Sequence, residues 1–226
     1  MEFEYEVVYS KRKTISLIVE RDRSIVVRAP IGTTNFEIEK IIENKKLWLF
    51  EKLRDPHKYP KPPIKKELVN GESLLYKGRI YRLEINQEFF TGVRFHSKFI
   101  ISQQHKDEAV NLIKNWYLDR AKEELPPRIK EFADNLGVDY KKILISDLMY
   151  SWASCTPKKN LNFNWRIIKA PLDVIDYLIV HELAHLIEPN HSPEFWNIVA
   201  VQIPNYRNAK EWLKKNGYQL EIEFEE

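Results

Sequence analysis

The sequence of 226 residues is poor in cysteine and lacks any long apolar run. Its single cysteine, Cys155, excludes a disulfide within the chain and favours a reducing compartment. A secretory signal begins with a basic segment that is followed by an apolar one, and the first residues of this sequence do not show that pattern. No segment approaches the roughly 20 apolar residues needed to span a bilayer. We therefore expect a soluble, cytoplasmic protein without a membrane partner.

The charge balance lacks a strong excess of either sign. The 36 basic and 33 acidic residues leave a formal net charge of +3, which neither requires nor excludes an anionic partner. The paired lysines are scattered and form no stripe with interleaved aromatic residues, so we expect them to lie on the solvated surface. These pairs are Lys65-Lys66, Lys141-Lys142, Lys158-Lys159 and Lys214-Lys215.

Residues 1–103 are predicted to form a β-rich N-terminal portion of an α+β protein. Apolar residues at helical spacing predict one helix over residues 35–53, and Thr34 with Glu37 matches a capping box. Four prolines and four lysines in residues 55–66 indicate a surface connection. Alternating apolar residues predict strands at residues 3–8, 15–19, 25–28, 73–76, 80–85 and 93–101.

Residues 104–226 are predicted to form a second portion, in which helices dominate. Helical spacing extends from about residue 107 to Gly137, which suits a helix end, and Pro126-Pro127 is expected to kink or split this helix. Strands are predicted at residues 142–148 and 160–164, separated by a turn. The remainder is predicted to be mainly helical.

The segment from Val174 to Trp196 contains the pattern His-Glu-x-x-His. Pro171 suits the first turn of a helix, and the apolar residues that follow predict that this helix is buried. On a helix, His181 and His185 project from the same face about one turn apart, so both can bind one metal ion. Glu182 lies beside them, where it can act as a general base on a water that the metal activates.

A catalytic zinc ion requires a third protein ligand, for which His191 is the candidate. If the helix continued, His191 would lie about 9 Å further along its axis, so the chain must turn back. Pro189 ends the helix, and Asn190 can adopt the left-handed conformation of a tight reversal. Ser192-Pro193-Glu194 then predicts the start of a new helix.

The pattern also permits less specific interpretations. His-Glu-x-x-His arises by chance in unrelated proteins, and a single histidine on an apolar helix is more often packed than bound to metal. Without a metal, however, two histidines and a glutamate on a buried helix would leave polar groups unpaired. Glu188, Glu194 and Glu211 are alternative third ligands, although each is more typical of a solvated helix residue.

Several further motifs resemble those of the YgjP-like family of zinc metallopeptidases, which is related to the SprT-like and WLM families. They are Trp152-Ala153-Ser154-Cys155, Asn164-Trp165-Arg166, Ala170-Pro171, Val174-Ile175-Asp176-Tyr177, Asn190-His191-Ser192 and Phe195-Trp196. The family usually has glycine where this chain has Ala153, so the backbone there must avoid conformations that only glycine tolerates.

The resemblance implies a zincin-like catalytic portion with a strand beside the metal-binding helix, and this strand can pair with an extended peptide. It suggests that residues 163–166 lie near the substrate. Arg166, Tyr150 and Tyr206 are candidates for stabilising the oxyanion, although each is equally compatible with a structural role.

The sequence thus predicts a zinc-dependent metallopeptidase that binds Zn²⁺ through His181, His185 and His191 and uses Glu182 as its general base. Its partner would be a protein or peptide substrate. One alternative is a nucleic-acid-associated zinc protein with a recruitment or structural role. Another is a metal-dependent hydrolase that acts on a non-protein substrate with the same residues. The sequence does not determine the oligomeric state.

Overall fold

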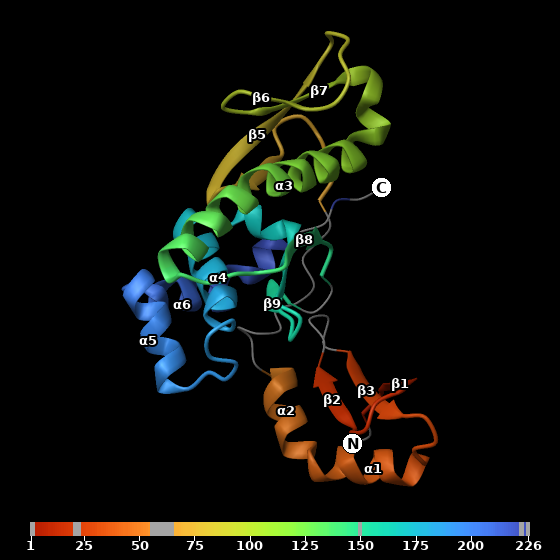
Figure 1. Cartoon of the computed structure of the whole chain (residues 1–226). Coiled ribbons are helices and arrows are strands. Elements are labelled where there is room, and N and C mark those ends of the chain that lie inside the picture. The colour runs from red at the N-terminus through yellow and green to blue at the C-terminus, as the bar shows by residue number, and fades with distance from the viewer. Residues whose placement is uncertain (1–2, 20–23, 55–65, 149–150, 222–223, 225–226) are drawn as a thin grey trace. The chain divides into compact units, whose positions relative to one another are not determined.

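The computed structural model describes residues 3–19, 24–54, 66–148, 151–221 and 224. Its helices and strands form a mixed α+β protein, as the sequence predicts (Figure 1). Contacts within the chain divide it into two compact units, Met1–Pro63 and Ile64–Glu226. None of the described helices is both long enough and apolar enough to cross a membrane.

The first unit is a three-stranded sheet covered by two helices. Strand β3 is central and pairs in parallel with β1 and antiparallel with β2. The apolar side chains of the sheet and of both helices form one core, which includes the fully buried Val27 and Leu49. The elements are β1 (Glu6–Ser10), β2 (Ser16–Val19), β3 (Ile25–Pro30), α1 (Asn35–Asn44) and α2 (Lys46–Arg54).

The single helix predicted over residues 35–53 is two helices that meet at Lys45. The predicted capping box at its start is confirmed, because the Glu37 carboxylate accepts from the Thr34 backbone N–H at 2.9 Å. Lys45 then leaves the helical conformation, with φ −106° and ψ 11°. A straight helix of that length would extend about 28 Å, whereas a three-stranded sheet is only about 10–20 Å across. The break keeps Leu49 in the same core as Ile38.

The second unit begins with a four-stranded sheet of order β4-β5-β7-β6. The strands predicted at residues 73–76 and 80–85 are confirmed, and they form a hairpin: β4 and β5 are antiparallel and join through Lys77 and Gly78, which both have positive φ. The strand predicted at residues 93–101 is instead a short hairpin that turns at Ser97. The strands are β4 (Ser73–Tyr76), β5 (Arg79–Asn86), β6 (Arg94–Phe95) and β7 (Phe99–Ser102).

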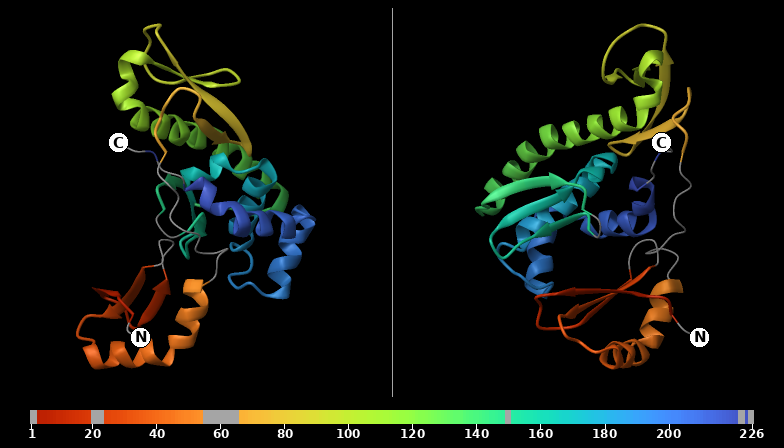
Figure 2. Two further views of the ribbon diagram at one scale, coloured as in Figure 1. Left: turned by 180° about the vertical axis from the view of Figure 1, so that it is seen from behind. Right: turned by 90° about the vertical axis from the view of Figure 1, so that its right-hand side faces the viewer.

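A second, three-stranded sheet of order β8-β10-β9 lies along the C-terminal half of α3 (Figure 2). Its strands are β8 (Lys142–Ser146), β9 (Ala153–Cys155) and β10 (Asn160–Asn164). The helices of this unit are η1 (Gln103–Glu108), α3 (Ala109–Leu136), η2 (Trp165–Lys169), α4 (Leu172–Ala184), α5 (Pro193–Gln202) and α6 (Tyr206–Leu220). Helix α4 packs against α3, α5 and α6, so it lies in the middle of the helical layer.

Helix α3 passes through Pro126 and Pro127 without splitting. It ends at Gly137 as predicted, and Gly137 adopts the left-handed conformation. The side chains around the prolines hold this segment in place. Leu125 and Ile129 are buried on one face, and Arg128 forms an ion pair with Asp176 of α4. Packing against α4 thus offsets the backbone hydrogen bonds that two prolines remove.

The boundary between the two compact units falls between residues 63 and 64 of the sequence, whereas the sequence analysis divided the chain between residues 103 and 104. The difference arises from a shared core. Leu83 and Phe99 of the four-stranded sheet are buried in the same apolar cluster as Ile113 and Tyr117 of α3. The strands at residues 73–102 therefore belong with the helices that follow them.

The hairpin turn at Lys77 and Gly78 is seated against the start of α4. The Gly78 N–H donates to the Lys169 carbonyl at 2.9 Å, and the Lys77 N–H donates to the Ile168 carbonyl at 3.0 Å. A Cβ on Gly78 would lie 2.8 Å from Pro171 Cγ and 2.9 Å from its Cα, closer than any normal contact. This turn therefore requires glycine for space as well as for its φ of 73°.

Gly78→Ala should destabilise the second unit by about 2–4 kcal/mol, because it combines an unfavourable backbone conformation with a clash against Pro171. Gly71→Ala is the matched control, since Gly71 also has positive φ but a Cβ there meets nothing within 4 Å. We expect the control to cost only about 1 kcal/mol. Urea unfolding followed by circular dichroism measures both, and equal losses would contradict the role of the Pro171 contact.

Candidate metal centre

Helix α4 carries polar residues into an apolar environment. Most of its side chains are buried, including Val174, Ile175, Ile179 and Leu183. Glu182 is 5% exposed, and His181 is only partly exposed. Burying a polar group without a hydrogen bond or another polar contact costs free energy. We therefore expect His181 and Glu182 to have polar partners.

Helix α4 ends at Ala184, and His185 follows as its C-cap residue. With φ −65° and ψ −15°, His185 keeps a right-handed helical backbone, so its ring centroid lies 5.0 Å from that of His181. Its Nδ1 lies 3.3 Å from the Glu188 carbonyl oxygen. A proton on Nδ1 would donate to that oxygen and leave a lone pair on Nε2, which is a common arrangement of metal-binding histidines.

The chain reverses after α4 through the segment that contains Pro189. The Asn190 N–H donates to Glu188 Oε1 at 3.1 Å, which ties the turn together. Asn190 does not use the left-handed conformation that the sequence analysis considered: among the described non-glycine residues, φ is positive only at Lys77, Ser97 and Lys159. The hydrogen bond from its N–H closes the turn instead.

Ser192 begins α5 as predicted, with Pro193 at the first helical position. The Ser192 hydroxyl accepts from the Phe195 N–H at 3.3 Å, a typical N-cap interaction. This cap sets the direction in which the chain leaves the turn. His191 precedes it directly and is thereby returned to the end of α4.

The turn and the cap bring His181, His185 and His191 together. One ring nitrogen from each lies within 4.8 Å of the others, and His181 Nε2 is 3.0 Å from His191 Nε2. Zinc–nitrogen bonds of about 2.0–2.1 Å in a tetrahedron place the nitrogens about 3.4 Å apart, so this spacing suits one ion. No other group of three His, Cys, Asp or Glu side chains with such spacing occurs in the described residues.

The electrostatics of the cluster keep two of its rings neutral. Burial, together with the nearby charges of His185, His191 and Lys210, lowers the pKa of His181 to about 3. Burial also lowers the pKa of His185. Neutral imidazoles offer the lone pairs that a metal ion requires. The donor set therefore fits a divalent cation such as zinc.

The Glu182 side chain lies between α4 and strand β9. Burial raises the pKa of its carboxyl to about 7, and a hydrogen bond from the Cys155 backbone opposes that rise. Glu182 is not part of the histidine group, although it is adjacent to His181 in the chain. A carboxyl group with a pKa near neutrality can both accept and release a proton at physiological pH.

The alternative acidic ligands are engaged elsewhere. Glu188 accepts from Asn190, and Glu211 pairs with Lys215 at 3.3 Å. The Glu194 carboxyl is exposed, and hydrogen bonds from its own backbone and from Ser192 lower its pKa. None of the three carboxylates joins the histidine group.

The oxyanion candidates have different environments. Arg166 forms an ion pair with Asp147 and lies over the Trp165 ring, so part of its guanidinium is already bound. Tyr206 is linked to the histidines through one ring, because it stacks on Trp196 with centroids 5.2 Å apart and Trp196 stacks on His191. Tyr150 lies outside the described residues.

Aromatic side chains surround the histidines, whereas the sequence analysis gave Phe195-Trp196 only as a motif shared with the resembled family. The buried Phe195 ring lies within 5 Å of all three imidazoles, with centroid distances of 4.9, 4.6 and 4.7 Å to His181, His185 and His191. Trp196 stacks on His191 at 5.6 Å and 23°. The one available signal was their position four and five residues after the third histidine, on the first turn of α5.

The strand that contacts α4 is β9, whereas residues 163–166, which the sequence analysis placed near the substrate, belong to β10 and η2. Strand β10, which contains Phe163 and Asn164, is central and pairs on both sides. Strand β9 lies at the edge of the sheet and contacts α4. Ala153 pairs with Phe163 in this strand, so it needs no conformation reserved for glycine, as expected.

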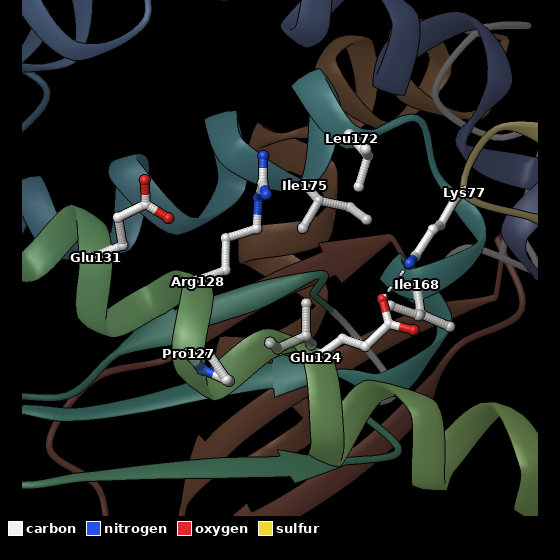
Figure 3. Close-up of a pocket in the computed structure, with 9 residues that line it drawn as sticks. Lys77, Glu124, Pro127, Arg128, Glu131, Ile168, Leu172 and Ile175 are labelled. Carbon is white, nitrogen blue, oxygen red and sulfur yellow. Dashed lines mark ion pairs between the residues drawn. The ribbon is translucent and has the colours of Figure 1, made fainter.

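A pocket of about 300 Å³ lies elsewhere in the second unit, between α3 and the start of α4 (Figure 3). Ile168, Leu172 and Ile175 line its apolar side. Lys77 and Glu124 form an ion pair at its rim. None of the three histidines lines it, so it is separate from the histidine cluster.

Comparison with known proteins gives one family and two solved structures. A family model described as "YgjP-like, metallopeptidase domain" matches residues 13–216. The metallopeptidase zymogen of Pyrococcus abyssi abylysin is 24% identical, covering 45% of this chain and 99% of its own, with a TM-score of 0.38. The zymogen of Methanocaldococcus jannaschii jannalysin is 20% identical, covering 39% and 94%, with a TM-score of 0.35. No curated protein matches the chain.

Ser192→Ala should destabilise the second unit by about 1 kcal/mol, because the Phe195 N–H at the start of α5 loses its acceptor. Ser192→Asp is the matched control, since aspartate is an equally good N-cap residue and should restore the stability. Chemical unfolding followed by circular dichroism compares the two variants. An alanine variant as stable as the wild type would show that the cap does not hold the turn.

Proposed function

This chain belongs to the YgjP-like family of metallopeptidases, and from that premise we propose that it hydrolyses peptide bonds with a zinc ion held by His181, His185 and His191. Membership of the family makes the protein a hydrolase that acts with a metal ion. The assignment of these three ligands is supported by one observation: an imidazole nitrogen of each lies within 4.8 Å of the others. Three histidine ligands leave a fourth position open, as catalytic zinc sites require.

The choice of zinc is supported by the chemistry of the donors. Imidazole nitrogens suit zinc, copper, iron and nickel, whereas magnesium and calcium prefer oxygen ligands. When bound, the zinc ion would polarise the scissile carbonyl group and make water a stronger acid. His185 is oriented for this role by the contact of its Nδ1 with the Glu188 carbonyl oxygen.

We assign the role of general base to Glu182. The carboxylate would take a proton from the attacking water and then donate it to the leaving nitrogen of the peptide. Burial supports this role, since it brings the pKa of Glu182 to about 7 and weakens the solvation of its charged form. The hydrogen bond from the Cys155 backbone holds the carboxyl group next to strand β9, and it favours the charged form of the carboxyl.

The arrangement of an edge strand beside the histidine-bearing helix supports a zincin-like mode of substrate binding. An extended peptide could add to the edge strand β9 by backbone hydrogen bonds, which recognise the backbone whatever its side chains. The scissile bond would then pass Glu182, because β9 contributes the Cys155 backbone group that binds this residue. Protein or peptide segments in an extended conformation are the proposed substrates.

Purified protein reconstituted with zinc should contain about one ion per chain, and His185→Ala or His191→Ala should lose it, because two ligands hold zinc far more weakly than three. Elemental analysis after dialysis measures the content. His96→Ala is the matched control, since His96 is exposed and outside the cluster. Zinc retained by both cluster variants would exclude the three-histidine site.

Glu182→Gln should retain zinc and reduce peptide hydrolysis by about 10²–10⁴-fold, because the amide cannot accept the proton of the attacking water. The initial rate on an unstructured protein such as casein and the zinc content are measured on the same samples. Glu211→Gln is the control, as Glu211 is exposed and pairs with Lys215. Hydrolysis at the wild-type rate by the Glu182 variant would refute the general-base role.

A further inference from the structure

Helix α6 places a lysine next to the aromatic wall of the histidine cluster. Lys210 is exposed, and its Nζ lies 4.4 Å from the centroid of the Trp196 ring. The Trp196 ring in turn stacks on His191, with centroids 5.6 Å apart, and lies 5.9 Å from His181. A single aromatic ring therefore separates the ammonium group from the proposed metal ligands.

The position of Lys210 is defined by packing. Helix α6 packs against α4, which carries His181. Tyr206 lies one turn before Lys210 on α6 and stacks on Trp196 at 5.2 Å and 17°. The tyrosine thus aligns this face of α6 with the Trp196 ring, and Lys210 is directed over the same ring. Two aromatic contacts therefore define the position of Lys210, so it is not an unconstrained surface side chain.

The charge of Lys210 is uncompensated. Among the described residues, no carboxylate forms an ion pair with it, whereas Lys215 on the same helix pairs with Glu211. Its contact with Trp196 is a cation–π interaction, which at an exposed site is comparable in strength with an ion pair and leaves the N–H donors of the ammonium group available. The ammonium group can therefore exchange this contact for a carboxylate when one is presented nearby.

From this geometry we infer that Lys210 is a specificity-determining residue that favours substrates with a carboxylate group within one or two residues of the scissile bond. The inference rests on the proposed function and adds a substrate class to it. An extended peptide rises about 3.3 Å per residue. One or two residues therefore cover a distance similar to the width of the Trp196 ring, which separates Lys210 from the proposed metal ligands. The group could belong to an acidic side chain or to the C-terminus of a peptide.

The other charged side chains near the cluster differ from Lys210 in sign or in position. Arg207 is a second cation on α6, but it lies over the Tyr206 ring, at 5.9 Å from the centroid, and not over Trp196. Glu188 and Glu194 are acidic and would repel a substrate carboxylate. Arg166 is the other cation considered for the site, and it is already paired with Asp147. The charge preference should therefore depend on Lys210.

The test uses zinc-loaded full-length protein and labelled peptides of one sequence that carry Glu, Gln or Lys at the two positions on each side of the scissile bond. A second pair of peptides differs only in ending with a carboxylate or an amide. We measure kcat/KM with the wild type, and peptide affinity by fluorescence anisotropy with Glu182→Gln. The wild type should prefer Glu over Gln by about fivefold at one of these positions, the effect expected for an exposed charge pair.

Substitutions at Lys210 should change this preference in a graded way. Lys210→Arg should keep it, Lys210→Met should remove it, and Lys210→Glu should reverse it in favour of the Lys peptide. Lys214→Met is the matched control on the same helix, since Lys214 is exposed and lies one turn further along, and it should behave as the wild type. A purely structural role for Lys210 would not reverse the preference.

The outcomes separate the two proposals. Peptide hydrolysis without any charge preference, or a preference that Lys210→Met and Lys210→Glu leave unchanged, would overturn the role of Lys210 while the proposed function stands. A reversible charge preference in binding, without hydrolysis by the wild type, would support Lys210 and overturn the peptidase. A preference for the terminal carboxylate, rather than for acidic side chains, would identify the C-terminus as the source.

Discussion

Burial of polar side chains on an apolar helix is the constraint from which the rest of the metal centre follows. Helix α4 must be buried because most of its residues are apolar, and it carries His181 and Glu182 into the interior. There, water no longer solvates their charged forms, so the histidine loses its proton and the carboxyl keeps its proton more readily. The same burial thus prepares one side chain to bind a cation and the other to exchange a proton.

The remaining parts of the site compensate for this burial. His185 obtains a backbone acceptor from Glu188, and Glu182 obtains a backbone donor from Cys155. His181 Nδ1 has no hydrogen-bond partner among the described residues, which leaves its other nitrogen as the point of interaction with the cluster. Phe195 closes the apolar side of the cluster, because its ring lies within 5 Å of all three imidazoles.

The features that the sequence predicted well are local ones. The capping box at Thr34, the left-handed end of α3 at Gly137 and the start of α5 at Ser192 depend on residues only a few positions apart. The approach of His191 to His181 was predictable for the same reason, because a proline-enforced turn joins them. The features that were missed depend on tertiary packing: the break at Lys45, the edge position of β9, and the contact of Lys210 with Trp196. No short pattern in the sequence encodes contacts between α5 and α6.

The separate cores of the two units have a thermodynamic consequence. Residues such as Val27, Ile38 and Leu49 form one apolar cluster, and the residues around α3 and α4 form another. The two clusters share no residue, so we expect calorimetry to resolve more than one cooperative transition. Trp48 belongs to the first unit and the other five tryptophans to the second, which makes indole emission report mainly on the unit that contains the histidines. A denaturation midpoint for this chain therefore describes one unit, and the chosen probe decides which.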